Sequence, residues 1–228
     1  MRARQLFLES LLAHDVTMFF GNPGSTENAV VDGLFEFDAL RYILALHEGV
    51  AVGAATFYAQ ASGKTPMVNL HAGPGLGNGI GMIYGALRAN VPMIVTAGQQ
   101  DTRMRMREPV LSHDLAAMAA PVVKFSMQIE QADEVSQAVR LAYKIANEAP
   151  KGPVFLALPL NVMEQETDAA LQGPGAIFHA AADAAGIKRA AEILAGASKP
   201  IIVAGDGVAQ AGASDAVGRL AELTGAEI

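Results

Sequence analysis

The chain has 228 residues, of which 51% are hydrophobic and 17% are charged, and its net charge is -7 at neutral pH. This charge, without basic clusters, argues against nucleic acid as a partner. The absence of cysteine excludes disulfides and thiolate metal sites and is typical of a cytoplasmic protein. No apolar run suggests a membrane span, and no signal-peptide core follows Met1. The large hydrophobic share predicts an oligomer.

Helices and strands are expected to alternate over residues 1–166. Apolar residues at helical spacing predict helices over residues 6–15, 29–37, 51–61 and 133–148. Asp101–Glu108, which carries three arginines, is predicted to be a solvated loop. Short apolar runs predict buried strands at Val16–Phe20, Arg41–Ile43, Pro66–Leu70, Val91–Thr96 and Pro153–Leu158. Such alternation predicts an α/β fold with a doubly wound parallel sheet and helices on both faces.

The composition changes near Thr167. Residues 167–186 are rich in alanine, glycine and aspartate, which predicts an interdomain linker. Beyond it, the pattern predicts a helix over 187–197, a strand over 200–204 and a helix over 212–224. One strand and two helices cannot bury a sheet of their own. We therefore expect residues 187–228 to be the incomplete start of a central α/β domain, and the chain to be the N-terminal portion of a longer protein.

Glu48 is the first candidate for chemistry. It lies at the predicted junction between the strand at Arg41–Ile43 and the helix that follows, where open α/β sheets bind their ligands. Apolar neighbours such as Leu46 and Val50 should desolvate its carboxylate and raise its pKa, which would suit it to hold or pass a proton. The alternative is a carboxylate that only complements the helix dipole.

Two glycine-rich stretches are ambiguous. The predicted loop Gly73–Gly79 resembles a phosphate cradle, but its spacing fits neither a dinucleotide fingerprint nor a P-loop, and its glycines could instead allow close helix packing. Gly205-Asp206-Gly207 resembles half of a metal-diphosphate motif but is predicted to be a strand-ending turn. The turn Gly21–Ser25 lacks the serine-hydrolase pattern, and no histidine pair has metal-ligand spacing on a helix.

Taken together, the ordered motifs resemble those of a known enzyme family. They are Gly21-Asn22-Pro23-Gly24-Ser25, Arg41–Glu48, Tyr58–Ser62, Asn69-Leu70-His71, Val95–Gln100, Pro121–Lys124 and Gly152-Pro153-Val154. The set resembles the N-terminal, pyrimidine-binding domain of the thiamine-diphosphate-dependent decarboxylase and acetolactate synthase superfamily, with benzoylformate decarboxylases most similar. The resemblance covers residues 1–166 and continues into the start of the family's central domain.

The resemblance implies a role for each matching residue. Glu48 matches the glutamate that hydrogen-bonds the aminopyrimidine ring of thiamine diphosphate and so activates the cofactor. Ser25 and His71 match the serine and histidine of the substrate site in benzoylformate decarboxylases, where the histidine relays a proton. Without its neighbours, His71 would be read as a strand-end histidine. The residues implied to contact the cofactor are Asn22, Pro23, Gly24, Glu48, Gly75, Asn78 and Gln99.

The substrate implied is a 2-keto acid. Val110 and Leu111 fall where benzoylformate decarboxylases have an apolar pair and acetolactate synthases have a glutamine. In the synthases the positions of Ser25 and His71 look like glycine and threonine. Two features resemble the synthases instead, namely His47 in place of a glutamine and the stretch Ala72–Gly75. The expected reaction is therefore non-oxidative decarboxylation.

Several alternatives stay open. They are an acetolactate synthase-type carboligase, a decarboxylase of another 2-keto acid or of an oxalyl thioester, and a non-catalytic pyrimidine-domain subunit completed by a partner. A nicotinamide-binding module would need a dinucleotide fingerprint that Gly21–Ser25 does not supply. The resemblance also implies Mg²⁺ held by a C-terminal domain absent from this chain. It further implies a homodimer or homotetramer with active sites between subunits, so that this portion alone is inactive.

Overall fold

The structure is a computed structural model, and it describes residues 1–178 and 180–228. It separates into two compact units, Met1–His179 and Ala180–Ile228. Among the described residues, no helix combines the length and the apolar character needed to cross a membrane. The linker predicted over 167–186 includes residue 179, which lies outside the described residues.

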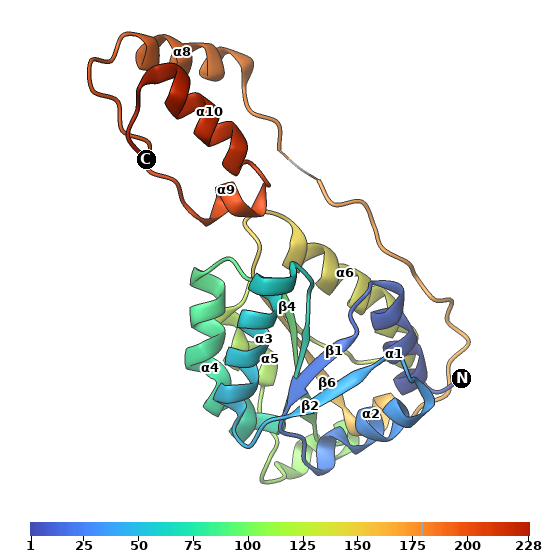
Figure 1. Cartoon of the computed structure of the whole chain (residues 1–228). Coiled ribbons are helices and arrows are strands. Elements are labelled where there is room, and N and C mark those ends of the chain that lie inside the picture. The colour runs from blue at the N-terminus through green and yellow to red at the C-terminus, as the bar shows by residue number, and fades with distance from the viewer. Residues whose placement is uncertain (179) are drawn as a thin grey trace. The chain divides into compact units, whose positions relative to one another are not determined.

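The first unit is built on a six-stranded, all-parallel sheet in the order β2-β1-β3-β4-β6-β5 (Figure 1). The doubly wound α/β fold predicted from the sequence is therefore confirmed. The strands are β1 Met18–Gly21, β2 Arg41–Leu44, β3 Met67–Leu70, β4 Met93–Gln99, β5 Ser126–Gln128 and β6 Pro153–Pro159. The order reverses between β1 and β3, so a crevice is expected beyond the carboxyl ends of these two strands.

Helices cover both faces of the sheet because the side chains of the central strands alternate between two apolar cores. Met67 and Ile94 pack in the first core, whereas Val68 and Val95 pack in the second. Figure 1 shows α1, α2 and α6 on one side of the sheet and α3, α4 and α5 on the other. The helices are α1 Ala3–Ala13, α2 Asn28–Gly33, α3 Glu48–Ser62, α4 Ala72–Arg88, α5 Leu115–Ala119, α6 Val135–Asn147 and α7 Leu160–Met163.

The structure corrects the sequence predictions for the first unit at several points. The strand at Arg41–Ile43 exists as β2, but it pairs only with β1 at the edge of the sheet and is largely exposed rather than buried. Gly73–Gly79 is not a loop, because α4 begins at Ala72 and contains all of its glycines. The sequence also missed β5, which has three residues and only partly buried side chains. The segment predicted as a solvated loop is exposed, but Thr102–Arg107 forms a 3-10 helix.

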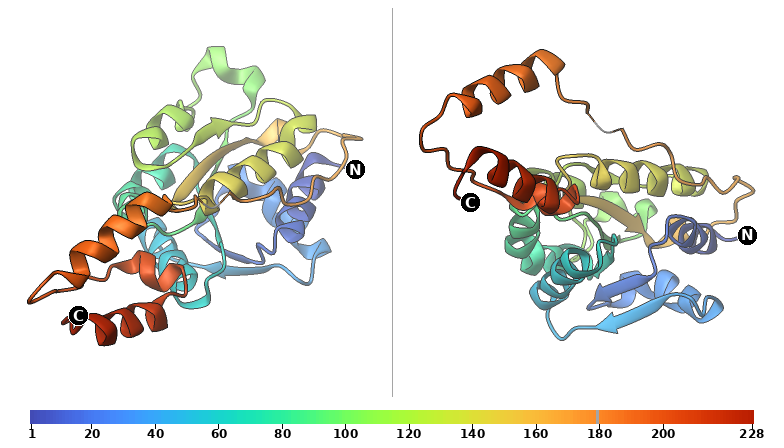
Figure 2. Two further views of the ribbon diagram at one scale, coloured as in Figure 1. Left: turned by 90° about the horizontal axis from the view of Figure 1, so that it is seen from above. Right: turned by 45° about the horizontal axis from the view of Figure 1, so that its top comes forward.

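Residues 167–178 run alongside α6 and are in contact with it (Figure 2). The Thr167 hydroxyl lies 2.5 Å from a carboxylate oxygen of Asp133, and the backbone N–H of Gln172 donates to the Ser136 hydroxyl at 2.7 Å. The ammonium of Lys144 lies 5.2 Å from the centre of the Phe178 ring. This stretch is therefore attached to the first unit by several side chains of α6 and of the turn that precedes it.

The second unit contains α8 Ala184–Ala195, α9 Asp206–Gln210 and α10 Ser214–Thr224. The strand predicted over 200–204 is wrong, since only an isolated bridge pairs Ile201 with Glu227. Gly205-Asp206-Gly207 is not a turn after a strand but the start of α9. A strand needs a neighbouring strand to form hydrogen bonds with its backbone N–H and C=O groups. The described residues of this unit contain no sheet that the apolar stretch near Ile201 could join.

A chain of buried polar groups crosses β1 in the first unit. The Tyr42 hydroxyl donates to Asn69 Oδ1 at 3.2 Å, and Asn69 Nδ2 donates to Thr96 Oγ1 at 3.2 Å. Burial, together with the negative charge of Glu27, raises the pKa of Tyr42 well above its usual range, so its hydroxyl remains a donor. Gly21 makes this crossing possible, since a Cβ there would lie 2.2 Å from the Tyr42 hydroxyl oxygen.

We predict that Gly21→Ala destabilises the protein by about 1–3 kcal/mol, the usual cost of overpacking. The added Cβ would also lie 2.4 Å from the carbonyl oxygen of Asn69, which is backbone and cannot rotate away. Urea denaturation measures the effect. Gly218→Ala is the control, because a Cβ at this helical glycine meets no atom within 4 Å. Equal stability of Gly21→Ala and the wild type would contradict this account of the crossing.

Candidate functional site

The candidate site lies where the sheet order reverses, beyond the carboxyl ends of β1, β2 and β3. Glu48 lies at a strand-to-helix junction, as the sequence predicts, and is the first residue of α3. It is only 6% exposed. Asn22 Nδ2, from the loop after β1, donates to Glu48 Oε1 at 3.2 Å. Asn78 Nδ2, from α4, donates to Oε2 at 3.0 Å. Three segments far apart in the sequence thus meet at one carboxylate.

The expected rise in the pKa of Glu48 is wrong for this chain. Burial is the largest single influence and would raise the pKa of Glu48. The hydrogen bonds from Asn78, from the backbone of Glu48 itself and from Asn22, with the charge of His47, together outweigh burial and lower this pKa. The apolar neighbours expected to desolvate the carboxylate point outward, with Leu46 91% and Val50 60% exposed. Glu48 therefore stays ionised at neutral pH in this structure.

His71 lies beside Glu48. Gly75 marks the meeting point, since a Cβ there would lie 3.2 Å from Glu48 Oε1 and 3.3 Å from His71 Cβ. His71 Nδ1 lies 2.8 Å from Glu27 Oε2, and the His71 side chain is 28% exposed. Gly24 approaches the ring so closely that a Cβ would lie 2.3 Å from it. The glycines at both positions keep space around the two side chains.

The other predicted residues of the same turn lie near this pair. Ser25 is the exposed first residue of a 3-10 helix, Ser25–Glu27, and its hydroxyl bonds to no described residue. Pro23 is half-buried in the loop between Asn22 and Gly24. The structure therefore brings together Asn22, Pro23, Gly24, Ser25, Glu48, His71, Gly75 and Asn78.

Gln99, Val110 and Leu111 belong to a second region. A cavity of about 810 Å³ lies beyond the carboxyl end of β4, lined by Gln99, Val110 and mostly polar residues. Gln99 Nε2 donates to the carbonyl oxygen of His113 at 2.6 Å. Val110 is 97% exposed, and Leu111 is half-buried in a turn. Within the described residues, no hydrogen bond joins any of these three residues to Glu48 or His71.

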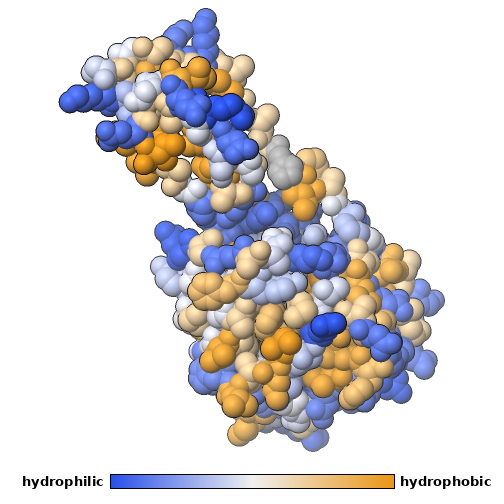
Figure 3. All heavy atoms as spheres, viewed as in Figure 1, coloured by the Kyte–Doolittle hydropathy of each residue, from blue (hydrophilic) through white to orange (hydrophobic). Residues whose placement is uncertain are grey.

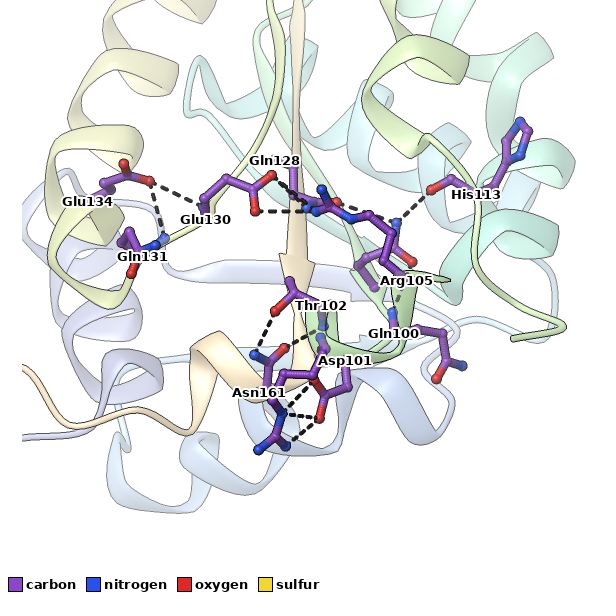
Figure 4. Close-up of polar contacts among 12 residues, drawn as sticks. Gln100, Asp101, Thr102, Arg105, His113, Gln128, Glu130, Gln131, Glu134 and Asn161 are labelled. Carbon is purple, nitrogen blue, oxygen red and sulfur yellow. Dashed lines mark hydrogen bonds and ion pairs between the residues drawn. The ribbon is translucent and has the colours of Figure 1, made fainter. Parts of the chain in front are cut away.

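The side chains of this second region are largely engaged with one another (Figure 4). Arg105 lies 3.4 Å from a carboxylate oxygen of Glu130, and Gln128 Nε2 donates to the same carboxylate at 2.9 Å. The backbone N–H of Thr102 donates to Asn161 Oδ1 at 3.0 Å. No metal cluster of three or more histidine, cysteine or carboxylate side chains occurs within the described residues.

Sequence reasoning missed Glu27. It is 1% exposed and accepts hydrogen bonds from backbone N–H groups of the loop after β1, the start of α4 and the end of β4. Its spacing from Gly24 is that of a helix-capping glutamate, which is the only local signal. That signal predicts a capping role and gives no indication of burial or of contact with His71.

The geometry suits a ring that carries a nitrogen and an amino group. An ionised carboxylate has about four acceptor sites. Glu48 therefore keeps free lone pairs after it accepts the hydrogen bonds from the side-chain amides of Asn22 and Asn78. The glycine at position 75 leaves the space beside this carboxylate free of a side chain. The residues present therefore fit the pyrimidine half of thiamine diphosphate. They offer no comparable set for a metal ion.

Family comparisons agree with the fold. Residues 1–134 match the thiamine pyrophosphate enzyme N-terminal TPP binding domain, and residues 187–228 match the thiamine pyrophosphate enzyme central domain. Benzoylformate decarboxylase of Pseudomonas aeruginosa is 38% identical over 221 residues, covering 94% of this chain and 41% of that protein. The acetolactate synthase large subunit of Lactococcus lactis is 30% identical over 217 residues, covering 92% and 37%.

Solved structures are similar as well. The 4-hydroxybenzoylformate decarboxylase of Rhodococcus jostii superposes with a TM-score of 0.87 at 31% identity, covering 97% of this chain and 42% of that one. Benzoylformate decarboxylase from Polynucleobacter necessarius gives a TM-score of 0.83 at 32% identity, covering 95% and 41%. The chain spans about two fifths of the length of these relatives.

We predict that Asn78→Ala moves the titration midpoint of Glu48 upward, because the bond from Asn78 is the main group that lowers the pKa of Glu48. The ¹³C shift of the Glu48 carboxyl carbon reports the midpoint. A depressed pKa stabilises the fold above the pKa of the unfolded chain, and this stabilisation is lost as pH falls through the folded pKa. The cost of the substitution, about 1–3 kcal/mol at neutral pH, should therefore shrink on acidification.

The control for this prediction is Asn147→Ala. Asn147 also bonds through its amide, to the carbonyl oxygen of Tyr143, but it does not touch Glu48. Its removal should leave the Glu48 midpoint at the wild-type value. An unchanged midpoint in Asn78→Ala would show that the amide does not hold the carboxylate.

Proposed function

The chain belongs to the thiamine pyrophosphate enzyme family, and from this we propose that it is the N-terminal portion of a thiamine-diphosphate-dependent 2-keto acid decarboxylase similar to benzoylformate decarboxylases. The observation that carries the proposal is the Glu48 carboxylate, held by Asn22 and Asn78 at the reversal point of the sheet with His71 beside it. We propose residues 1–166 as the pyrimidine-binding domain, 167–186 as the linker and 187–228 as the start of the central domain.

When bound, thiamine diphosphate supplies an electron sink that permits loss of carbon dioxide from a 2-keto acid. Glu48 would hydrogen-bond a nitrogen of the aminopyrimidine ring and share a proton with it. Asn22, Pro23, Gly24, Gly75, Asn78 and Gln99 are the further residues that we propose to hold the cofactor. Mg²⁺ would be bound mainly by a domain outside this chain.

Ser25 and His71 would handle the substrate. Ser25 follows β1 and His71 follows β3, at the same edge of the sheet as Glu48, and both are accessible to solvent. The Ser25 hydroxyl can donate to a substrate carboxylate, and an imidazole can take up and return a proton near neutral pH. Val110 and Leu111 would contribute to the substrate pocket, and exposed Val110 is free to contact an aromatic group.

A carboligase of the acetolactate synthase type is the second candidate. The synthase relative is 30% identical to this chain, and Ala72–Gly75 with His47 resemble the synthases. Product analysis with pyruvate separates the two, because a carboligase joins two substrates whereas a decarboxylase releases an aldehyde.

The first test of the decarboxylase is Glu48→Gln in the full-length protein. An amide cannot share a proton with the ring nitrogen as a carboxylate does, so exchange of the thiazolium proton should slow on the order of 10²-fold or more. Ser25→Ala and His71→Ala should leave this exchange nearly intact but slow decarboxylation of an aromatic 2-keto acid. Proton exchange followed by NMR distinguishes the two steps. Wild-type exchange in Glu48→Gln would reduce Glu48 to a helix-terminal carboxylate.

We also propose a cytoplasmic homodimer or homotetramer whose active sites lie between subunits. Hydrophobic residues are exposed on the face of the first unit that carries α3 and α4 (Figure 3). They include Leu44, Leu46, Val50, Phe57, Met82 and Tyr84, each at least 43% exposed. An apolar surface of this kind next to Glu48 is expected to be covered by another subunit.

Phe57→Lys should therefore weaken assembly of the full-length protein, because it places a charge in the middle of this apolar face. Light scattering and sedimentation would show a smaller species, and turnover should fall with it. Phe35→Lys is the matched control, since Phe35 is 88% exposed but lies in a different part of the first unit, beside α2. A fully active monomer would rule out a site shared between subunits.

A further inference from the structure

The Glu27 carboxylate has five hydrogen-bond partners inside the first unit. Oε2 accepts from the backbone N–H of Gly24 at 2.7 Å and lies 2.8 Å from His71 Nδ1. Oε1 accepts from the Thr26 hydroxyl at 2.7 Å, from the Gly98 N–H at 2.8 Å and from the Ala72 N–H at 3.3 Å. Because the three backbone N–H groups and the Thr26 hydroxyl all donate, both oxygens of Glu27 act as acceptors, as those of an ionised carboxylate do.

This arrangement decides which nitrogen of His71 carries the hydrogen. Nδ1 has two polar neighbours, Glu27 Oε2 and the Thr26 hydroxyl oxygen at 3.3 Å. The Thr26 hydroxyl already gives its hydrogen to Glu27, so towards His71 it can only accept. Nδ1 must therefore donate, and the neutral ring carries its free lone pair on Nε2, which bonds to no described residue.

The ring cannot easily turn away from this contact. The backbone of Gly24 lies against it, at a distance that leaves no room for a Cβ. Gly98 approaches Glu27 in the same way, since a Cβ there would lie 2.2 Å from Oε1. The loop after β1 and the end of β4 thus lie close against the imidazole and the carboxylate, at distances that only glycine allows.

We propose that Glu27 is a positioning residue that holds His71 as the Nδ1–H tautomer and so reserves Nε2 for proton transfer. The assignment of the tautomer is independent of the proposed function, but its use in decarboxylation rests on that function. There, Nε2 first takes up a proton from solvent. The departing carbon dioxide then leaves its bonding electrons on the substrate carbon, the proton on Nε2 takes its place to give an aldehyde, and the ring returns to its neutral form. The hydrogen on Nδ1 stays against Glu27 throughout. A carboxylate behind an imidazole holds the tautomer in this manner in other enzymes.

Glu27→Gln separates the tautomer from the packing. The amide keeps the shape of the carboxylate but carries an NH₂ group in place of one oxygen. With that group toward His71, only the Gly24 N–H loses its acceptor, and the ring must present Nδ1 as an acceptor and move its hydrogen to Nε2. The opposite orientation leaves the Gly98 and Ala72 N–H groups without their acceptor.

The direct test is ¹⁵N NMR of the full-length protein labelled at histidine, at about pH 8, where a free imidazole is neutral. His71→Asn identifies the His71 signals by their loss. The wild type should show the Nδ1–H tautomer without cofactor or substrate. A wild-type Nε2–H tautomer would overturn the proposal without any Glu27 variant.

Three variants assign the cause. Glu27→Gln should convert His71 wholly or partly to the Nε2–H tautomer, whereas Thr26→Val should leave it as Nδ1–H. Glu134→Gln is the matched control, because Glu134 is also the third residue of a capped 3-10 helix and accepts two backbone N–H groups, but touches no histidine. A tautomer that changes in Thr26→Val and not in Glu27→Gln would assign the role to Thr26 and refute ours.

Kinetics then link the tautomer to the reaction. Glu27→Gln should lower kcat for an aromatic 2-keto acid on the order of 10²-fold, with little change in exchange of the thiazolium proton, which depends on Glu48. Glu134→Gln should change neither. Wild-type kcat in a Glu27→Gln protein with a switched tautomer would exclude a positioning role in catalysis. Absence of any 2-keto acid turnover in the wild type would refute the proposed function and leave the tautomer result standing.

Discussion

The buried carboxylate of Glu27 is the interaction on which the crevice depends. An ionised group removed from water costs several kcal/mol unless hydrogen bonds replace its hydration. Glu27 recovers these bonds from the loop after β1, the start of α4 and the end of β4. Because the donors come from three segments, the carboxylate satisfies backbone groups that the sheet leaves unpaired and fixes the segments relative to one another.

Two carboxylates of the crevice are held for different purposes. Glu27 points inward and has a donor at every side, so it is rigid and has no capacity for a ligand. Glu48 accepts only two side-chain amides and adjoins an exposed apolar face, so it keeps acceptor capacity toward the outside. His71 lies between them and contacts Glu27 directly. The difference in hydrogen bonding, rather than residue type, separates a structural carboxylate from one that can bind.

The sequence predicted the α/β fold and the position of Glu48 well, because alternation of apolar runs and the strand-to-helix junction are local patterns. The sequence predictions failed where residues distant in the chain determine the burial or the secondary structure of a segment. Glu27 reads locally as a capping residue, and its burial depends on His71 and Gly98, which lie 44 and 71 residues away. The apolar run of β2 does not reveal that the strand lies at an edge. Glycine at every second position from 73 to 79 indicated a loop, but packing of α4 against β3 and α3 overrides the low helix propensity of glycine.

The lowered pKa of Glu48 and the exposed apolar face have a common cause. The carboxylate follows Leu44 and Leu46 and precedes Val50, and these side chains point away from the chain's own core. Within this chain, desolvation of Glu48 is therefore incomplete and its amide donors prevail. A surface laid over the leucines and Val50 would remove water from the carboxylate and oppose those donors, raising the pKa of Glu48. The sequence pattern that suggested a desolvated glutamate would then describe Glu48 in the proposed oligomer, where a second subunit would cover the apolar side chains that flank the carboxylate.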